Sequence, residues 1–251
     1  MFKYRFKVFI TQIVSIFLFL LLWEVGVQSG YINSFIFSSP LKVLTTLIDL
    51  AIRGDLFVHF GTTLFEVLLA FVLGSIIAFL VSILLYNFKF LADVLDPFLT
   101  MLNSLPKVAL GPIIIIWVGA NTKSIITMAL LINVIISIIT IYNGFINIDE
   151  IKYKLFQSFK ANKKQILFKL IIPGSISSII SALKINISLT FIGVIMGEFL
   201  VSKKGIGYLI LYGTQVFNLN LVITGIFVLI IMSYGIYKIV SYIEKKMLIN
   251  S

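Results

Sequence analysis

The composition of this 251-residue chain excludes an ordinary water-soluble fold. Hydrophobic residues make up 60% of it and charged residues 12%, against about 45–50% and about 25% in a typical soluble domain. A soluble globule of this size would expose large apolar patches, so we expect the lipid bilayer to be its solvent. The absence of cysteine and the single His59 exclude disulfides, thiolate metal sites and paired-histidine zinc enzymes.

Six stretches are long and apolar enough to cross a bilayer as helices, which takes about 20 residues. They cover residues 8–27, 62–85, 97–118, 124–145, 176–201 and 221–243. No small-residue cleavage motif follows the first stretch, so we predict an uncleaved span rather than a signal peptide. The predicted fold is an all-α integral membrane protein with six transmembrane helices and both termini on one side.

The basic residues predict which side that is. Lys and Arg outnumber Asp and Glu by 20 to 10, and short cytoplasmic loops carry the excess of Lys and Arg. With the N-terminus in the cytoplasm, 14 of the 20 basic residues lie on the inner side: Lys3, Arg5, Lys7, Lys89, Lys152, Lys154, Lys160, Lys163, Lys164, Lys169, Lys184, Lys238, Lys245 and Lys246. This orientation explains the basic excess without a nucleic-acid partner.

The predicted organisation has three parts. Residues 1–28 form an N-terminal transmembrane helix, residues 29–61 an external loop, and residues 62–245 a membrane core that includes a cytoplasmic loop at 149–174. Ser39 and Pro40 are typical of a helix start, and an amphipathic pattern follows them. We therefore expect a short interfacial helix inside the external loop.

Two prolines interrupt the third span. Pro106 and Pro112 each lack the backbone donor that a helix needs, so we expect a kink or an unwound segment where protein or water satisfies the freed carbonyls. Together with Lys107 between them, they are candidates for a transport pathway.

Small and polar residues recur at helical spacing in the fourth and fifth spans. These faces are Asn133, Ser137, Thr140 and Gly144; Ser177, Ser181, Lys184 and Ser188; and Asn186, Thr190, Gly193 and Gly197. Small residues at this spacing are typical of close helix packing in membranes. The alternative is that the polar faces line a solute route.

Ionisable residues inside spans are functional candidates, because one at mid-membrane costs about 2.5–3.5 kcal/mol even on lenient insertion scales. Here they are Glu24, Glu66, Lys107, Lys184 and Glu198. Each also has a structural explanation, since the glutamates lie near predicted span ends and Lys184 can extend its amine to the interface. We find no catalytic set, metal-binding motif or phosphate-binding loop. We therefore expect no cofactor on this chain and an energy source on another chain.

The loop at 149–174 is amphipathic and basic. Asp149 is a candidate helix cap, and an interrupted apolar stripe follows, made of Leu155, Phe156, Phe159, Ile166, Leu167 and Leu170. Such a segment either rests on anionic lipid or inserts its apolar side chains into a partner's groove.

In its spacing, this loop resembles the EAA loop of bacterial ABC-importer permeases, whose coupling helices dock on ATPase subunits. In that register the EAA triplet falls on Lys154, Leu155 and Phe156, the glycine on Lys160, and the closing I-x-L-P on residues 170–173. Pro173 matches, whereas the triplet and the glycine do not. A lysine in the glycine position must avoid the left-handed conformation or bear a cost of about 1 kcal/mol or more. The coupling loop implied by this resemblance comprises Lys154, Leu155, Phe156, Phe159, Lys160, Ala161 and Pro173.

The resemblance extends over about residues 39–244 and is closest to the nitrate, sulfonate and taurine branch of these permeases. The matching segments are Ser39–Pro40, Asp96–Pro97, Leu105 to Ala109, Pro112, Trp117, Gly119, Lys123, Asn143–Gly144, Glu198 and Gly205 to Tyr208. One departure is Glu66, where this branch usually carries Arg.

The resemblance implies the permease subunit of an ATP-binding-cassette importer in a bacterial cytoplasmic (inner) membrane. Its partners would be a second copy of the chain, two ATPase subunits that bind ATP and Mg, and an extracytoplasmic binding protein. The solute would be a small organic anion, such as a sulfonate, or nitrate, or a pyrimidine-type vitamin precursor. The alternatives are a secondary transporter or channel that works without ATPase subunits and, third, an intramembrane enzyme.

Overall fold

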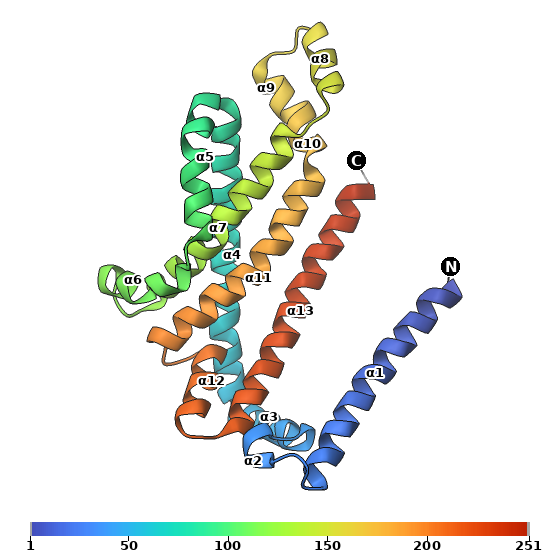
Figure 1. Cartoon of the computed structure of the whole chain (residues 1–251), viewed down its shortest axis with the longest axis vertical. Coiled ribbons are helices and arrows are strands. Elements are labelled where there is room, and N and C mark those ends of the chain that lie inside the picture. Colours follow the sequence, from blue (N-terminus) through green and yellow to red (C-terminus); the bar gives the residue numbers. More distant parts are fainter. Residues whose placement is uncertain (1, 250–251) are drawn as a thin grey trace. The chain divides into compact units, whose positions relative to one another are not determined.

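The computed structural model describes residues 2–249, and it describes side chains at residues 4 and 6–246, so Lys3 and Arg5 lie outside the described side chains. Every regular element in the described range is a helix (Figure 1). Five helices are long and apolar enough to cross a membrane, and a bent helix pair makes a sixth if it is counted as one span. The predicted all-α membrane fold is confirmed.

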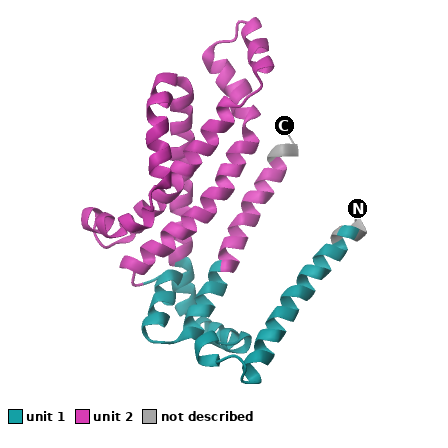
Figure 2. Ribbon diagram, in the orientation of Figure 1, with its two compact units in different colours: residues 1–61, 204–229 teal, residues 62–203, 230–251 magenta. Residues whose placement is uncertain are grey.

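The chain divides into two compact units (Figure 2). Unit 1 comprises residues 1–61 and 204–229, and unit 2 comprises residues 62–203 and 230–251. The helices, in chain order, are α1 (Phe2–Gln28), α2 (Ser34–Phe37), α3 (Pro40–Arg53), α4 (Asp55–Asn87), α5 (Lys89–Ser104), α6 (Gly111–Val118), α7 (Thr122–Ile146), α8 (Glu150–Ser158), α9 (Lys163–Ile166), α10 (Ile172–Gly174), α11 (Ile176–Val201), α12 (Ile206–Gln215) and α13 (Leu219–Ile249).

In unit 1, the end of α1 is fixed to the start of α3. The Ser39 side chain caps α3 by accepting from Lys42 N, with Pro40 in the first turn, as the sequence predicts. The Glu24 carboxylate accepts a hydrogen bond from Leu41 N at 3.0 Å. A helix N-terminus carries partial positive charge, so Glu24 has a structural role here. The short helix α2 was not predicted.

The core of unit 2 is built on α7 and α11, its most extensively packed pair of helices. A Cβ added at Gly193 would lie 2.4 Å from Cα of Ala129, and one at Gly197 would lie 2.9 Å from Cα of Ile125. The two backbones therefore meet where the sequence has its GxxxG pair, the close packing expected of small residues in membranes.

The interruption expected in the third predicted span, at 97–118, is present as a sharp bend. α5 ends at Ser104, a short 3-10 turn spans Lys107–Leu110, and α6 then leaves at 87° to α5. The break falls at Leu105 and Pro106, because the residue before a proline is pushed into extended backbone, and Leu105 has ψ of 137°. Pro112 lies in the first turn of α6, where its missing N–H removes no helical bond.

Candidate functional site

Residues 149–174 form two short helices joined by a tight turn. Asp149 caps α8 by accepting from Ile151 N at 2.8 Å, and Asn162 forms a capping box with Gln165 at α9. At the end of α8, Ala161 N donates to Phe156 O and Lys160 N donates to Gln157 O. These two bonds are a Schellman motif, which requires a left-handed residue and usually uses glycine. Lys160 supplies it with φ of 55°.

The apolar side chains of α8 lie on two faces. Ile151, Leu155 and Phe159 are 78%, 52% and 76% exposed, and their four-residue spacing puts them on one stripe. Phe156 lies on the adjacent face and packs, partly buried, against the core cluster of unit 2 around Phe145. The sequence interpretation grouped Phe156 with Leu155 and Phe159; in the structure Phe156 is less exposed than these two, and Ile151 is exposed beside them. We call Ile151, Leu155 and Phe159 the α8 stripe.

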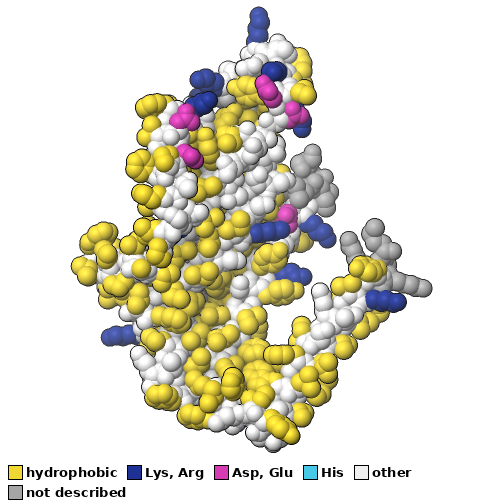
Figure 3. Space-filling model, in the orientation of Figure 1, with side chains coloured by type: hydrophobic (Ala, Val, Ile, Leu, Met, Phe, Trp, Pro, Cys, Tyr) yellow, Lys and Arg dark blue, Asp and Glu magenta, His cyan; other side chains and the backbone are white. Residues whose placement is uncertain are grey.

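The rest of the loop anchors this stripe. Ile166, Leu167 and Leu170 are buried, and residues 167–171 form a π-helical turn. Pro173 follows in the first turn of α10. Figure 3 shows charged side chains gathered over α8, α9 and the adjoining end of α5. Lys154 belongs to this group and pairs with Glu150 at 2.9 Å on the surface.

Buried polar side chains link three helices inside unit 2. Asn133 Nδ2 donates to Thr190 Oγ1 at 2.7 Å, Thr190 Oγ1 donates to Asn186 Oδ1 at 2.9 Å, and Asn186 Nδ2 donates to Ser75 Oγ at 2.8 Å. A Cβ at Gly74 would lie 2.5 Å from Asn133 Oδ1, so the absence of a side chain there makes room for the amide. This hydrogen-bonded chain holds α7, α11 and α4 together.

Other polar candidates lie outside that chain. Ser137 is buried and Thr140 half-buried, and each hydroxyl bonds to the carbonyl one turn earlier in α7. Ser181 and Ser188 are exposed on the opposite side of α11 from Asn186 and Thr190, and Ser181 Oγ donates to Ser177 O. The hydroxyls of Ser137 and Thr140 thus bond within α7, while Ser181 and Ser188 lie on an exposed side of α11.

Two glutamates meet inside unit 2. Glu198 and Glu66 are 0% and 1% exposed, and the carboxyl of Glu66 lies beside that of Glu198 and the hydroxyl of Thr122. Thr63 Oγ1 donates to Glu198 Oε1 at 2.6 Å. Among the described residues, Glu66 Oε2 has no hydrogen-bond partner. The position at which the sequence departs from its branch therefore lies directly against Glu198.

Comparison with known proteins decides the family. Residues 70–249 match the family model described as the binding-protein-dependent transport system inner membrane component. The chain belongs to this permease family. It is 25% identical over 227 residues to the aliphatic sulfonates transport permease protein SsuC of Bacillus subtilis, covering 90% of this chain and 82% of SsuC. This agrees with the sulfonate branch predicted from the sequence.

Two further comparisons bear on fold and solute. The formylaminopyrimidine transport permease protein ThiX of Halalkalibacterium halodurans is 25% identical over 189 residues, which is 75% of each chain. An inward-facing structure of the MetNI methionine ABC transporter matches with a TM-score of 0.68 and 18% identity, covering 78% of this chain and 98% of that one. At that identity the MetNI match shows the fold.

The two lysines singled out in the predicted spans, Lys184 and Lys107, have partners. Lys184 Nζ lies 2.6 Å from Glu244 Oε2 of α13 and 5.7 Å from the ring centre of Tyr237. Lys107 Nζ donates to Asn103 O at 3.1 Å, across the break that Pro106 makes. The charge of Lys184 is therefore balanced inside unit 2, and its amine does not need to reach the membrane interface. Among the described residues, no three His, Cys, Asp or Glu side chains gather to hold a metal.

Changing Lys160 to Gly should stabilise the end of α8 by about 1 kcal/mol, because glycine adopts the left-handed conformation without the side-chain penalty. Hydrogen exchange of the α8 amides in the purified permease would show slower exchange. Lys164→Gly is the matched control. It places a glycine inside α9, where glycine lowers helix stability instead of raising it. Unchanged or faster α8 exchange in Lys160→Gly would contradict the assignment of strain to Lys160.

Proposed function

We propose that two copies of this permease form a pathway across the cytoplasmic membrane, with one ATPase subunit docked on the α8 stripe of each copy. The exposed stripe carries this proposal. Ile151, Leu155 and Phe159 present three large apolar side chains on a short capped helix, the spacing with which a helix fills a partner's groove. The interrupted stripe also suits a lipid surface, but the family is a component of binding-protein-dependent transport systems.

The exposed serines of α11 support a pathway between two copies. Ser177, Ser181 and Ser188 are exposed on a helix long and apolar enough to span, and polar side chains in spans usually face a bundle interior or water rather than lipid. A second copy and a water-filled route between the copies would cover them. The bend between α5 and α6 is the other feature we assign to this route, because non-helical backbone at membrane depth is tolerated where it lines a cavity or is buried in protein.

For the solute, we propose a small organic anion or a pyrimidine-type vitamin precursor, delivered by an extracytoplasmic binding protein. SsuC and ThiX are named for transport of an aliphatic sulfonate and a formylaminopyrimidine. Lys184 is already paired with Glu244. We therefore do not assign it the role of a positive charge that attracts an anionic solute. We assign selectivity to the binding protein.

The orientation proposed from the basic loops places both termini and the α8 stripe in the cytoplasm. It keeps the division into an N-terminal span at 1–28, an external segment at 29–61 and a core at 62–245. In this arrangement α8 faces the ATPase.

The test is reconstitution of the permease in vesicles, alone and with the ATPase subunit and binding protein of its transport system. We expect solute uptake only with all three proteins and ATP, and a ligand that co-purifies with the binding protein. Gradient-driven uptake by the permease alone would overturn the proposal in favour of a secondary transporter or channel.

A further inference from the structure

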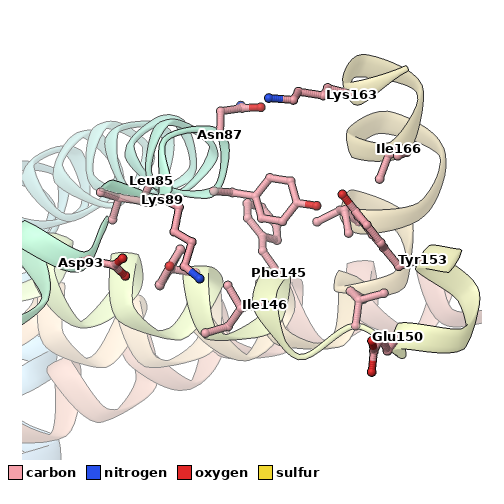
Figure 4. Close-up of a pocket in the computed structure, with 14 residues that line it drawn as sticks. Leu85, Asn87, Lys89, Asp93, Phe145, Ile146, Glu150, Tyr153, Lys163 and Ile166 are labelled. Carbon is pink, nitrogen blue, oxygen red and sulfur yellow. The ribbon is translucent and has the colours of Figure 1, made fainter. Parts of the chain in front are cut away.

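A cavity of about 780 Å³ lies beside the α8–α9 loop in unit 2. Figure 4 shows its walls: the end of α4 and the start of α5 on one side, the end of α7 as the floor, and the loop on the other. Phe145 and Ile166 line it from the buried core. Asn87 and Lys163 face each other across its mouth.

The depth of this cavity is set by the ends of two spans. The candidate spans in α4 and α7 end at Asn87 and Ile146, and both residues line the cavity. A hydrophobic span ends where lipid headgroups begin. Tyr86, Tyr142 and Tyr153 also line the cavity, and tyrosine is enriched at this level of the membrane. The cavity therefore lies at headgroup depth.

The charges of the cavity favour an anion. Lys89 and Lys163 line it from opposite walls, together with the carboxylates of Asp93 and Glu150. Glu150 pairs with Lys154 at 2.9 Å. The remaining charges of the lining are the two positive charges of Lys89 and Lys163 and the one negative charge of Asp93. Basic pockets between membrane helices on the cytoplasmic side are typical headgroup sites.

An apolar hollow adjoins the same lysine. It has a volume of about 530 Å³ and is lined by Leu84, Phe88, Lys89, Phe90 and Leu91. Phe88 and Phe90 are 59% and 82% exposed. A polar cavity and an apolar hollow that share Lys89 match the two ends of an amphipathic molecule.

We propose that this composite site binds one anionic phospholipid, with its phosphate between Lys89 and Lys163 and an acyl chain over Phe88 and Phe90. The site lies next to the α8 stripe, so the bound lipid would hold the α8–α9 loop against the ends of α4 and α7. Lipid binding needs neither the ATPase nor the solute, and its test is independent of the proposed function.

The experiment is native mass spectrometry of the delipidated full chain in a neutral detergent, titrated with phosphatidylglycerol or phosphatidylcholine. We expect one tightly bound phosphatidylglycerol. In the variant Lys89→Ser/Lys163→Ser its affinity should fall about thirtyfold, since each lysine near an anionic headgroup contributes about fivefold. The control Lys164→Ser/Lys169→Ser removes the same charge from lysines of the same loop that do not line the cavity, and it should retain binding. Lys89→Arg/Lys163→Arg should retain binding too, which separates loss of charge from misfolding.

Four results would overturn the proposal. They are equal affinity for phosphatidylcholine, an equal loss in the control variant, displacement of phosphatidylglycerol by inorganic phosphate, and displacement by the ATPase subunit. The third would make the cavity a site for a soluble anion, and the fourth would make it part of a protein interface.

Discussion

Replacing Phe159 with Asp should strongly weaken ATPase docking on this permease and with it solute-stimulated ATP hydrolysis. Phe159 is 76% exposed on the α8 stripe, so the variant should fold and insert normally. In the complex, the carboxylate would be buried in an apolar groove without a partner, and central interface residues of this kind contribute about 2–4 kcal/mol. We therefore expect the Kd for the ATPase subunit to rise about thirtyfold or more, measured with the permease in lipid nanodiscs.

Two other positions on α8 make this test specific. Gln157→Asp introduces the same charge on the exposed side of α8 away from the stripe and should change the Kd less than about threefold, as expected for a surface substitution. Phe156→Asp should also weaken docking, but by a different route, because Phe156 packs on the core cluster and its loss would loosen the whole loop. Faster amide exchange throughout residues 149–174 would identify that route. Equal losses in Phe159→Asp and Gln157→Asp would contradict the assignment of docking to the stripe.

The sequence predicts those features that depend on local backbone chemistry. Asp149 and Ser39 cap the helices they were expected to cap, because a side-chain oxygen before a helix satisfies free backbone donors wherever it occurs. Pro106 marks the break in the third span for an equally local reason. The proline gives the position of the break, whereas the 87° bend depends on how α6 packs on α7 and α11.

The parts of the candidate site that the sequence did not predict depend on contacts between distant residues. Thr63 and Glu198 are 135 positions apart, and Lys184 and Glu244 are 60 apart, so no periodicity connects them. On α8, apolar residues at 151, 155, 156 and 159 surround much of a short helix. Their spacing therefore does not show which side of α8 packs on the core. The structure shows that Phe156 packs there, against the cluster around Phe145. For the same reason the cavity beside the loop has no sequence signal, since its walls come from three stretches of the chain, 85–93, 142–153 and 163–171.

The close packing of α7 and α11 leads to a second strong effect. Gly193→Ala should destabilise the permease by about 2 kcal/mol or more, because the new Cβ would lie 2.4 Å from Cα of Ala129. A backbone atom cannot rotate away as a side chain does, so the two helices would have to separate along their whole contact. Gly197→Ala should have a smaller effect of the same sign, since its nearest backbone atom is 2.9 Å away.

Gly235 of α13 provides a control with the opposite sign. A Cβ there would meet nothing within 4 Å, so Gly235→Ala should leave the free energy of unfolding unchanged or raise it by up to about 1 kcal/mol through helix propensity. Reversible unfolding in mixed micelles measures all three variants on one scale. If Gly193→Ala and Gly235→Ala had equal effects, the α7–α11 contact would not be the packed centre of unit 2. The small residues of α11 would then be free to line the solute route, the alternative that the sequence left open.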